Sequence, residues 1–125
     1  MENLLNLIKE KKIELDSYRP LPIELVQNLD HWFKIESTYN SNAIEGNTLT
    51  KKETTLVIEK GITIGGKSLK EHLEAINLSF AFDYIKSFSK KKYSDISLKD
   101  ILHLHYLVLK KIDDKNAGKF RKIAV

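Results

Sequence analysis

The segment of this sequence whose residue types and order most suggest a reactive or regulatory site is a carboxylate followed by glycine and asparagine. It is Glu45-Gly46-Asn47, inside the segment YNSNAIEGNTLTKKET that runs from Tyr39 to Thr54. This arrangement could be the middle of an active site that handles a phosphate. It could equally be a carboxylate placed so that it blocks such a site. The elements that position Glu45 therefore matter as much as the residue itself.

The other reactive residue types form no general catalytic motif. The sequence has no cysteine, which excludes a disulfide framework, a thiolate zinc site and a cysteine nucleophile. His103 and His105 are two residues apart and so point to different sides of a helix, whereas a zinc-binding helix needs a spacing of four. We expect His105, on an apolar face, to be a hydrogen-bonded core histidine. His31 and His72 have the pattern of ordinary helix positions.

The charge pattern disfavours a nucleic-acid partner. The net charge is +4, but of 21 basic residues only Arg19 and Arg121 are arginine, and the lysines are spread along the chain. The one dense run, residues 90–92, lies among serines, and we expect a solvated loop there. The N-terminal segment mixes charges into its apolar residues, so it resembles neither a signal peptide nor a membrane span. We expect a cytoplasmic protein with no membrane partner.

The apolar periodicity predicts an all-α chain of one compact domain. Helix-capping boxes at Thr50 with Glu53 and at Ser68 with Glu71 predict two of the helix starts, and Ser97 with Asp100 predicts a third. The tail FRKIAV could begin a strand. We predict helices over an N-terminal segment spanning Leu4 to Leu15, over about 23–39, from 51 to just before Gly61, from 69 onward, and from 98 to about Lys111.

Three of these helices should each bury an apolar face. The expected core positions are Val26, Leu29, Trp32 and Phe33 in the second helix, Leu73, Ile76, Phe80 and Tyr84 in the fourth, and Ile101, His105, Val108 and Ile112 in the fifth.

The order of the segments resembles the first part of Fic-family proteins, the all-helical enzymes that transfer AMP from ATP to protein hydroxyls. The resemblance is carried by IESTYNSNAIEGNTLTKKETTLVIEKGITIGGKSLKEHLEAINLSFAFDYI, then LKDILHLHYLVLKK, then GKFRKIAV, from about Ile35 to the last residue. It implies an incomplete Fic-like helical bundle over residues 35–125, preceded by N-terminal helices over 1–34. It also implies that the tail is the first strand of a β-hairpin flap.

The family's catalytic motif, H-x-F-x-(D/E)-G-N-G-R-x-x-R, does not fit this chain. When it is laid over residues 41–49, Ser41 stands where the histidine should be, Ala43 replaces the phenylalanine, and Thr48-Leu49 replaces Gly-Arg. Serine cannot act as a base near neutral pH, and the charge partner of the phosphate is missing. We therefore expect no catalytic, metal or cofactor-binding residue in this chain, and no AMP transfer from it alone.

A second family motif, (S/T)-x-x-x-E-(G/N), fits at Ser41, Glu45 and Gly46. In Fic proteins it marks the inhibitory helix, whose glutamate pairs with the last arginine of the catalytic motif and occupies the place of the ATP terminal phosphate. The resemblance thus implies that Glu45 is a regulatory carboxylate in an inhibitory helix over about 35–47. The alternative is an N-cap serine and a C-terminal glycine around an exposed glutamate.

The resemblance also implies what a complete enzyme would use: ATP, Mg²⁺, a protein hydroxyl as target and a possible homo-oligomer, in a bacterial, cytoplasmic protein. No cofactor is expected for this chain alone. Because the sequence stops where the family continues into a hairpin and the catalytic helix, we expect a portion of a larger protein or the product of a shortened reading frame. Two other functions stay open: a catalytically dead stand-alone inhibitor or interaction module of Fic type, and a basic helical nucleic-acid-binding protein, which few arginines disfavour.

Overall fold

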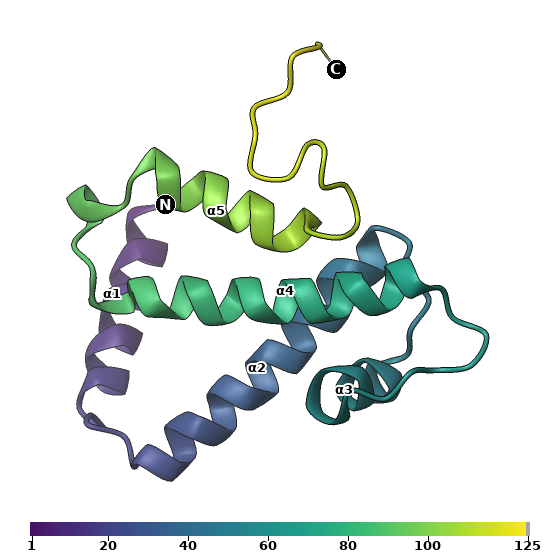
Figure 1. Ribbon diagram of the computed structural model, residues 1–125. Coiled ribbons are helices and arrows are strands. Elements are labelled where there is room, and N and C mark those ends of the chain that lie inside the picture. The colour runs from purple at the N-terminus through teal and green to yellow at the C-terminus, as the bar shows by residue number, and fades with distance from the viewer. Residues whose placement is uncertain (125) are drawn as a thin grey trace. The chain divides into compact units, whose positions relative to one another are not determined.

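The computed structural model describes residues 1–124 and divides into two units, Met1–Trp32 and Phe33–Val125. The described residues form helices and loops and no strand, so the all-α prediction is confirmed. The strand predicted in the tail is not formed through Ala124, where the backbone is irregular. Figure 1 shows the helices. They are α1 (Glu2–Asp16), α2 (Ile23–Ile44), α3 (Lys51–Lys60), α4 (Leu69–Ser87) and α5 (Leu98–Leu109), with two short 3-10 turns, η1 (Phe88–Lys90) and η2 (Tyr93–Asp95).

The three predicted capping boxes are confirmed. At the start of α3, α4 and α5 the side chain of Thr50, Ser68 or Ser97 accepts the backbone N–H three residues on, and the acidic side chain there accepts the cap N–H. These bonds satisfy backbone donors that the first helical turn leaves unpaired. Local sequence therefore fixes where these helices begin.

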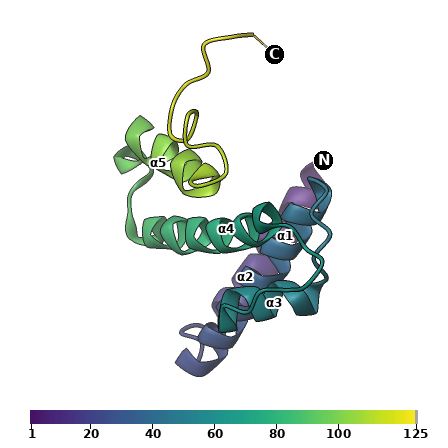
Figure 2. The same cartoon turned by 45° about the vertical axis from the view of Figure 1, so that its right-hand side comes forward.

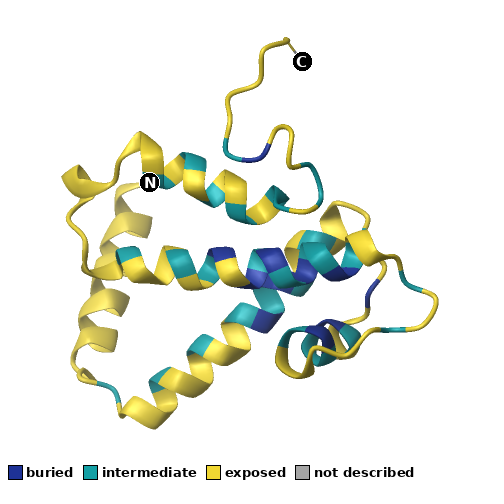
Figure 3. Ribbon diagram, viewed as in Figure 1, coloured by how far each residue is buried: buried dark blue, intermediate teal, exposed yellow. Residues whose placement is uncertain are grey.

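The core of the unit from residue 33 onward is small and lies where α3 meets α4. Leu49, Val57 and Ala75 are buried, and the partly buried Ile58, Ile64 and Ile76 pack against them. Helix α4 contacts both α3 and α5, and Figures 1 and 2 both show α5 running beside α4. Figure 3 shows the buried positions concentrated on α3, on α4 and on the last part of α2.

The aromatic pair of α2 is exposed, so that part of the core prediction is wrong. Trp32 is 58% exposed and Phe33 is 61% exposed. Burial on α2 begins about one turn later, at Ile35 and Thr38. That stretch of α2 is also where ion pairs join it to its neighbours, from Lys34 to α4 and from Glu36 to α3.

The predicted apolar stripe of α4 is right for the partly buried Leu73, Ile76 and Tyr84 and wrong for Phe80, and the most deeply buried positions carry small or polar side chains. Phe80 is half exposed, whereas Ala75, Asn77 and Ala81 are almost completely buried. A helix with neighbours on more than one side does not bury a single face, and small side chains let those neighbours approach closely. Apolar periodicity alone could not reveal this.

Helix α5 has no buried residue, although Ile101 and Val108 were expected in the core. His105 is exposed, so the prediction of a core histidine is wrong in its burial. The prediction that this histidine is hydrogen-bonded is confirmed, since Nδ1 of the His105 ring accepts the N–H of Gly118 at 3.0 Å. The lysine run at 90–92 is exposed, as predicted; it comprises the last residue of η1 and the two residues that connect η1 to η2.

Candidate functional site

Helix α2 ends in a Schellman motif built around the predicted regulatory residues. The N–H of Asn47 donates to the carbonyl of Asn42 at 3.0 Å, and the N–H of Gly46 donates to the carbonyl of Ala43 at 3.1 Å. Gly46 has φ +95°, a left-handed conformation that glycine adopts at little cost. Glu45 is therefore the last residue before the chain reverses, in the C-cap position.

The structure brings Ser41, Glu45 and Gly46 together on one exposed helix end. All three are exposed, and Ser41 lies one turn before Glu45 inside the continuous helix Ile23–Ile44. Ser41 is therefore not an N-cap, which removes that half of the alternative reading. Helix α2 was expected to end near Tyr39, but it continues five residues further, to the glycine that can reverse the chain.

The segment that follows Gly46 is fixed to the start of α4 by hydrogen bonds to one carboxylate. Glu71 Oε1 accepts the backbone N–H of Thr48 at 2.8 Å and its hydroxyl at 2.6 Å. Glu71 Oε2 accepts the N–H and the hydroxyl of Ser68 at 2.9 and 3.1 Å. Lys67 Nζ adds a bond of 2.7 Å to the carbonyl of Thr48.

These donors hold the pKa of Glu71 well below its ordinary value, at about 2. The hydroxyl of Thr48 is the main cause, followed by the backbone N–H groups of Ser68 and Thr48. Hydrogen bonds to the charged form of a carboxylate favour ionisation. Glu71 is thus a permanent anion near neutral pH, shared between the α4 cap and the segment after the turn.

Asn47 makes the second connection between this segment and α4. Its Nδ2 donates to the carbonyl of Glu71 at 3.1 Å and to Glu74 Oε2 at 2.9 Å. Its Oδ1 accepts the N–H of Leu49 at 2.9 Å, which shapes the turn that leads into the core. Two consecutive residues after Gly46 are therefore anchored, and the position of Glu45 relative to α4 follows from them.

Two ion pairs fix the last part of α2 to its neighbouring helices. Lys34 Nζ lies 2.8 Å from Asp83 Oδ2 of α4, and Lys51 Nζ of α3 lies 2.6 Å from Glu36 Oε1. Exposed pairs of this kind contribute little to stability, about 0.2–1 kcal/mol each. These ion pairs therefore constrain the orientation of this part of α2 relative to its neighbours more than they contribute to the free energy of folding.

His72 has a structural role that the sequence did not reveal. It is buried, its Nε2 accepts the N–H of Ile64 at 2.8 Å, and its Nδ1 lies 2.7 Å from the carbonyl of Ser68. This geometry requires a neutral ring with the proton on Nδ1, because Nε2 must accept. His72 thus fixes the loop before α4 and offers no free nitrogen for acid-base chemistry.

Metal-ligating side chains do not cluster in the part of the chain that the structure describes. Within residues 1–124, no three His, Asp or Glu side chains gather in a way that could hold a metal ion. Carboxylates such as Glu71 and Glu74 are already used as acceptors for hydrogen bonds from protein groups. These carboxylates thus do not form a metal centre by themselves, and the function proposed below includes no step through a metal ion. Among these same residues, no helix combines the length and the apolar character needed to cross a bilayer.

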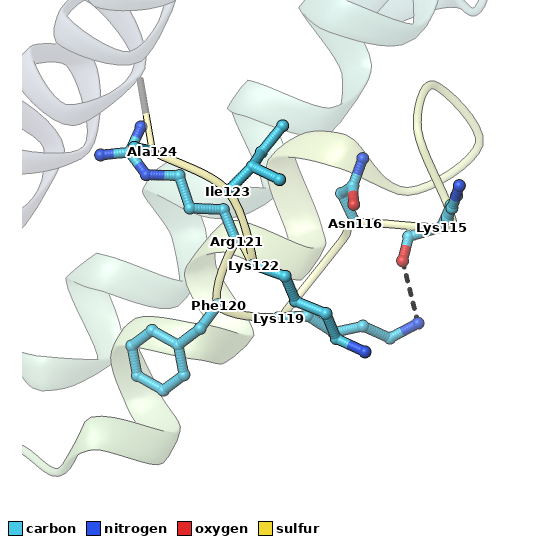
Figure 4. Close-up of a pocket in the computed structure, with 8 residues that line it drawn as sticks. All are labelled: Lys115, Asn116, Lys119, Phe120, Arg121, Lys122, Ile123 and Ala124. Atoms are coloured by element: carbon cyan, nitrogen blue, oxygen red, sulfur yellow. Dashed lines mark hydrogen bonds between the residues drawn. The ribbon is translucent and has the colours of Figure 1, made fainter.

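A basic pocket of about 780 Å³ lies along the C-terminal segment (Figure 4). Its charged lining is entirely cationic, from Lys115, Lys119, Arg121 and Lys122, and Phe120 adds an aromatic ring. In the close-up, the side chains of Arg121 and Lys122 extend away from the segment in opposite directions. From the sequence we expected a strand in this segment, and we did not foresee a pocket.

Sequence reasoning missed the residues that hold the site in place: Asn47, Thr48 and His72. Glu71 was predicted only as a helix cap. The one sequence feature that could have indicated a further role is that a capping carboxylate has two oxygens and the cap needs only one, so the other can bind a second partner. No spacing in the sequence identifies the residue that binds the other oxygen, because Thr48 and Glu71 are 23 residues apart.

No family model matches the chain. Among curated proteins, the protein adenylyltransferase Fic of Nematostella vectensis is 32% identical over 124 residues, which cover 99% of this chain and 29% of that protein. The protein adenylyltransferase fic-1 of Caenorhabditis briggsae is 41% identical over 88 residues, 70% of this chain and 17% of that protein. The chain thus spans less than a third of the length of these relatives. Both relatives are animal proteins, so the expectations of a bacterial and cytoplasmic protein stay predictions.

Solved structures give the same result at the level of the fold. A segment of Fic-1 from C. elegans matches with a TM-score of 0.77 and 30% identity, over 97% of this chain and 38% of that one. A glutamate-to-glycine variant of the same segment matches with a TM-score of 0.77 and 29% identity. Sequence and fold therefore agree over nearly all of the chain, and the protein belongs to the Fic family, to whose N-terminal part it corresponds.

Proposed function

We propose that this chain is the autoinhibitory and scaffold portion of a protein adenylyltransferase, which transfers AMP from ATP to a hydroxyl of a target protein. The relatives named above carry that activity in their names. The observation that carries the proposal is the end of α2, where a Schellman motif holds the backbone of Glu45 while its side chain is exposed. Glu45 is the inhibitory residue of this proposal.

A carboxylate in this position can compete with a phosphate for an arginine. Both groups accept two parallel N–H bonds from one guanidinium, so the arginine binds one of them at a time. The arginine in question belongs to a part of the family's fold outside residues 1–124. Occupation by Glu45 keeps that arginine from the terminal phosphate of the nucleotide, and the reactive pose is lost.

The other two motif residues serve the presentation of Glu45. Gly46, with φ +95°, lets the chain reverse directly after the glutamate, and a side chain there would meet a strained backbone. Ser41 lies on the preceding turn of the helix, and its small side chain leaves the approach to Glu45 open. Both roles are local consequences of how α2 ends.

The test is AMP transfer by the intact protein made from its native gene, measured as label incorporated from ATP labelled in the α-phosphate. Glu45→Gly and Glu45→Gln are compared with the wild type. We expect both variants to raise incorporation, by about 5- to 150-fold if the inhibitory contact has the strength of typical couplings between sites. Gln keeps the length of the side chain and removes only its charge, so it should release less than Gly.

Glu24→Gln is the matched control. Glu24 lies in the first turn of the same helix and is exposed, and its substitution removes the same charge 21 residues from Glu45. Its incorporation should equal that of the wild type. An intact protein whose incorporation does not change with Glu45→Gly would refute the inhibitory role of Glu45.

A further inference from the structure

The capping carboxylates of this chain differ in what they bind beyond their own helix. Among residues 1–124, the side-chain carboxylate of Glu53 hydrogen-bonds only to Thr50, within its own capping box. Glu71 uses one oxygen for its cap at Ser68 and the other for Thr48. The second oxygen of Glu71 therefore reaches the segment that directly follows the Glu45-Gly46 turn.

We propose that Glu71 is the positioning residue of the inhibitory glutamate: by binding Thr48 it fixes the end of α2 to the start of α4 and so sets where Glu45 points. This inference rests on the proposed function. It assigns to Glu71 a part in regulation that is separate from the capping of α4. Glu71 acts through Thr48 and does not touch the reacting groups.

The path from Glu71 to Glu45 is short and has little freedom. Only Gly46 and Asn47 lie between Glu45 and Thr48, and both have backbone N–H bonds to the last turn of α2. Asn47 is held at its side chain by Glu74 as well. A shift of Thr48 away from α4 must therefore move the turn, and the direction of the Glu45 side chain moves with it.

The negative charge of Glu71 is needed for this contact. Its two oxygens accept four donors, two from Thr48 and two from Ser68, at 2.6 to 3.1 Å. A glutamine of the same shape has one acceptor oxygen, and its NH₂ group would face the N–H donors of one partner. Glu71→Gln therefore loses either the Thr48 side or the cap, with no change in volume. Because the pKa is about 2, the contact does not switch near neutral pH.

The experiment compares Glu71→Gln with Glu53→Gln in the intact protein. Both variants remove a capping-box carboxylate of the same type, but only at Glu71 does the carboxylate also bind the segment that follows the turn. Two readouts are taken: label incorporated from ATP, and backbone amide exchange of the peptide that covers residues 42–49. We expect Glu71→Gln to raise exchange of that peptide and to raise incorporation about 10-fold, the effect of weakening hydrogen bonds to a charged group. Glu53→Gln should leave both unchanged.

The outcomes separate this inference from the proposed function. If Glu45→Gly raises incorporation and Glu71→Gln does not, the proposed function stands and the positioning role is refuted. If Glu71→Gln raises exchange no more than Glu53→Gln does, the positioning role is refuted whatever the activity. The double variant Glu45→Gly with Glu71→Gln should be no more active than Glu45→Gly alone. A larger, additive gain would show that Glu71 acts by another route, and would also refute the inference.

Discussion

Asn77 is the polar residue whose replacement should destabilise the helical scaffold most clearly. Its side chain is 1% exposed, and its Nδ2 donates to the carbonyls of Val108 and Lys110 at 3.1 and 2.8 Å. These carbonyls lie at the C-terminal end of α5, where helix geometry leaves acceptors without partners. One amide group of α4 thus satisfies two acceptors of α5.

The magnitude follows from these two bonds. Each neutral hydrogen bond contributes about 1 kcal/mol net, so Asn77→Ala loses about 2 kcal/mol, and up to about 4 kcal/mol where the carbonyls stay away from water. The assay is the free energy of unfolding from urea denaturation, with the dependence on urea unchanged. Asn77→Asp should destabilise at least as much near pH 7, since a carboxylate cannot donate to a carbonyl.

Asn40→Ala is the control for this prediction. Asn40 is exposed, and its Nδ2 bonds only within α2, to the carbonyl of Glu36 at 2.8 Å and to its side chain. Alanine is the better helix former, so the change should stay within about 0.5 kcal/mol. If Asn77→Ala falls within the same range, the bond between α4 and the end of α5 does not stabilise the fold, and the reasoning is refuted.

Two further predictions concern the scaffold. Leu49→Ala should lower the free energy of unfolding by about 2–5 kcal/mol, because Leu49 is 3% exposed and belongs to the core cluster. Leu69→Ala, at a side chain that is 74% exposed, should lower it far less. Equal losses for the two variants in urea denaturation would contradict this prediction. Glu71 and Asp100 have pKa values of about 2 in the fold, below their unfolded values of 4.5 and 3.8, so their stabilisation is complete above those values and is lost as the pH falls toward 2. The melting temperature should therefore fall over this range, less steeply in Glu71→Gln, and parallel curves for the two proteins would exclude a contribution from this carboxylate.

Local chemistry explains which parts of the fold could be predicted from the sequence. A capping box depends on residues three apart, so Thr50, Ser68 and Ser97 gave the starts of three helices correctly. The end of α2 was harder, because Asn40, Ser41 and Asn42 have low helix propensity and suggested an earlier stop. The helix continues because only Gly46 adopts the left-handed conformation at which the chain reverses.

The core could not be predicted, because periodicity does not say how many neighbours a helix has. Helix α4 meets both α3 and α5, so Ala75 and Ala81 are buried although they lie outside the predicted stripe, and Phe80, which belongs to that stripe, is half exposed. The same distinction between local and long-range features applies to the candidate site. The motif residues were visible in the sequence, whereas the contact of Thr48 with Glu71 depends on a fold that brings distant residues together.

The small apolar core has a consequence for regulation. Leu49, Val57 and Ala75 are the buried members of the core cluster, so the arrangement of helices after residue 33 depends strongly on polar contacts. Asn77 and His72 are buried examples, and Glu71 joins Lys67 and Glu74 in binding the segment after Glu45. Hydrogen bonds fix direction more narrowly than apolar contacts do, since they weaken steeply with distance and angle. An inhibitory carboxylate must meet a guanidinium at hydrogen-bond distance, so a scaffold tied by polar contacts suits that task better than a larger apolar interface that can slide.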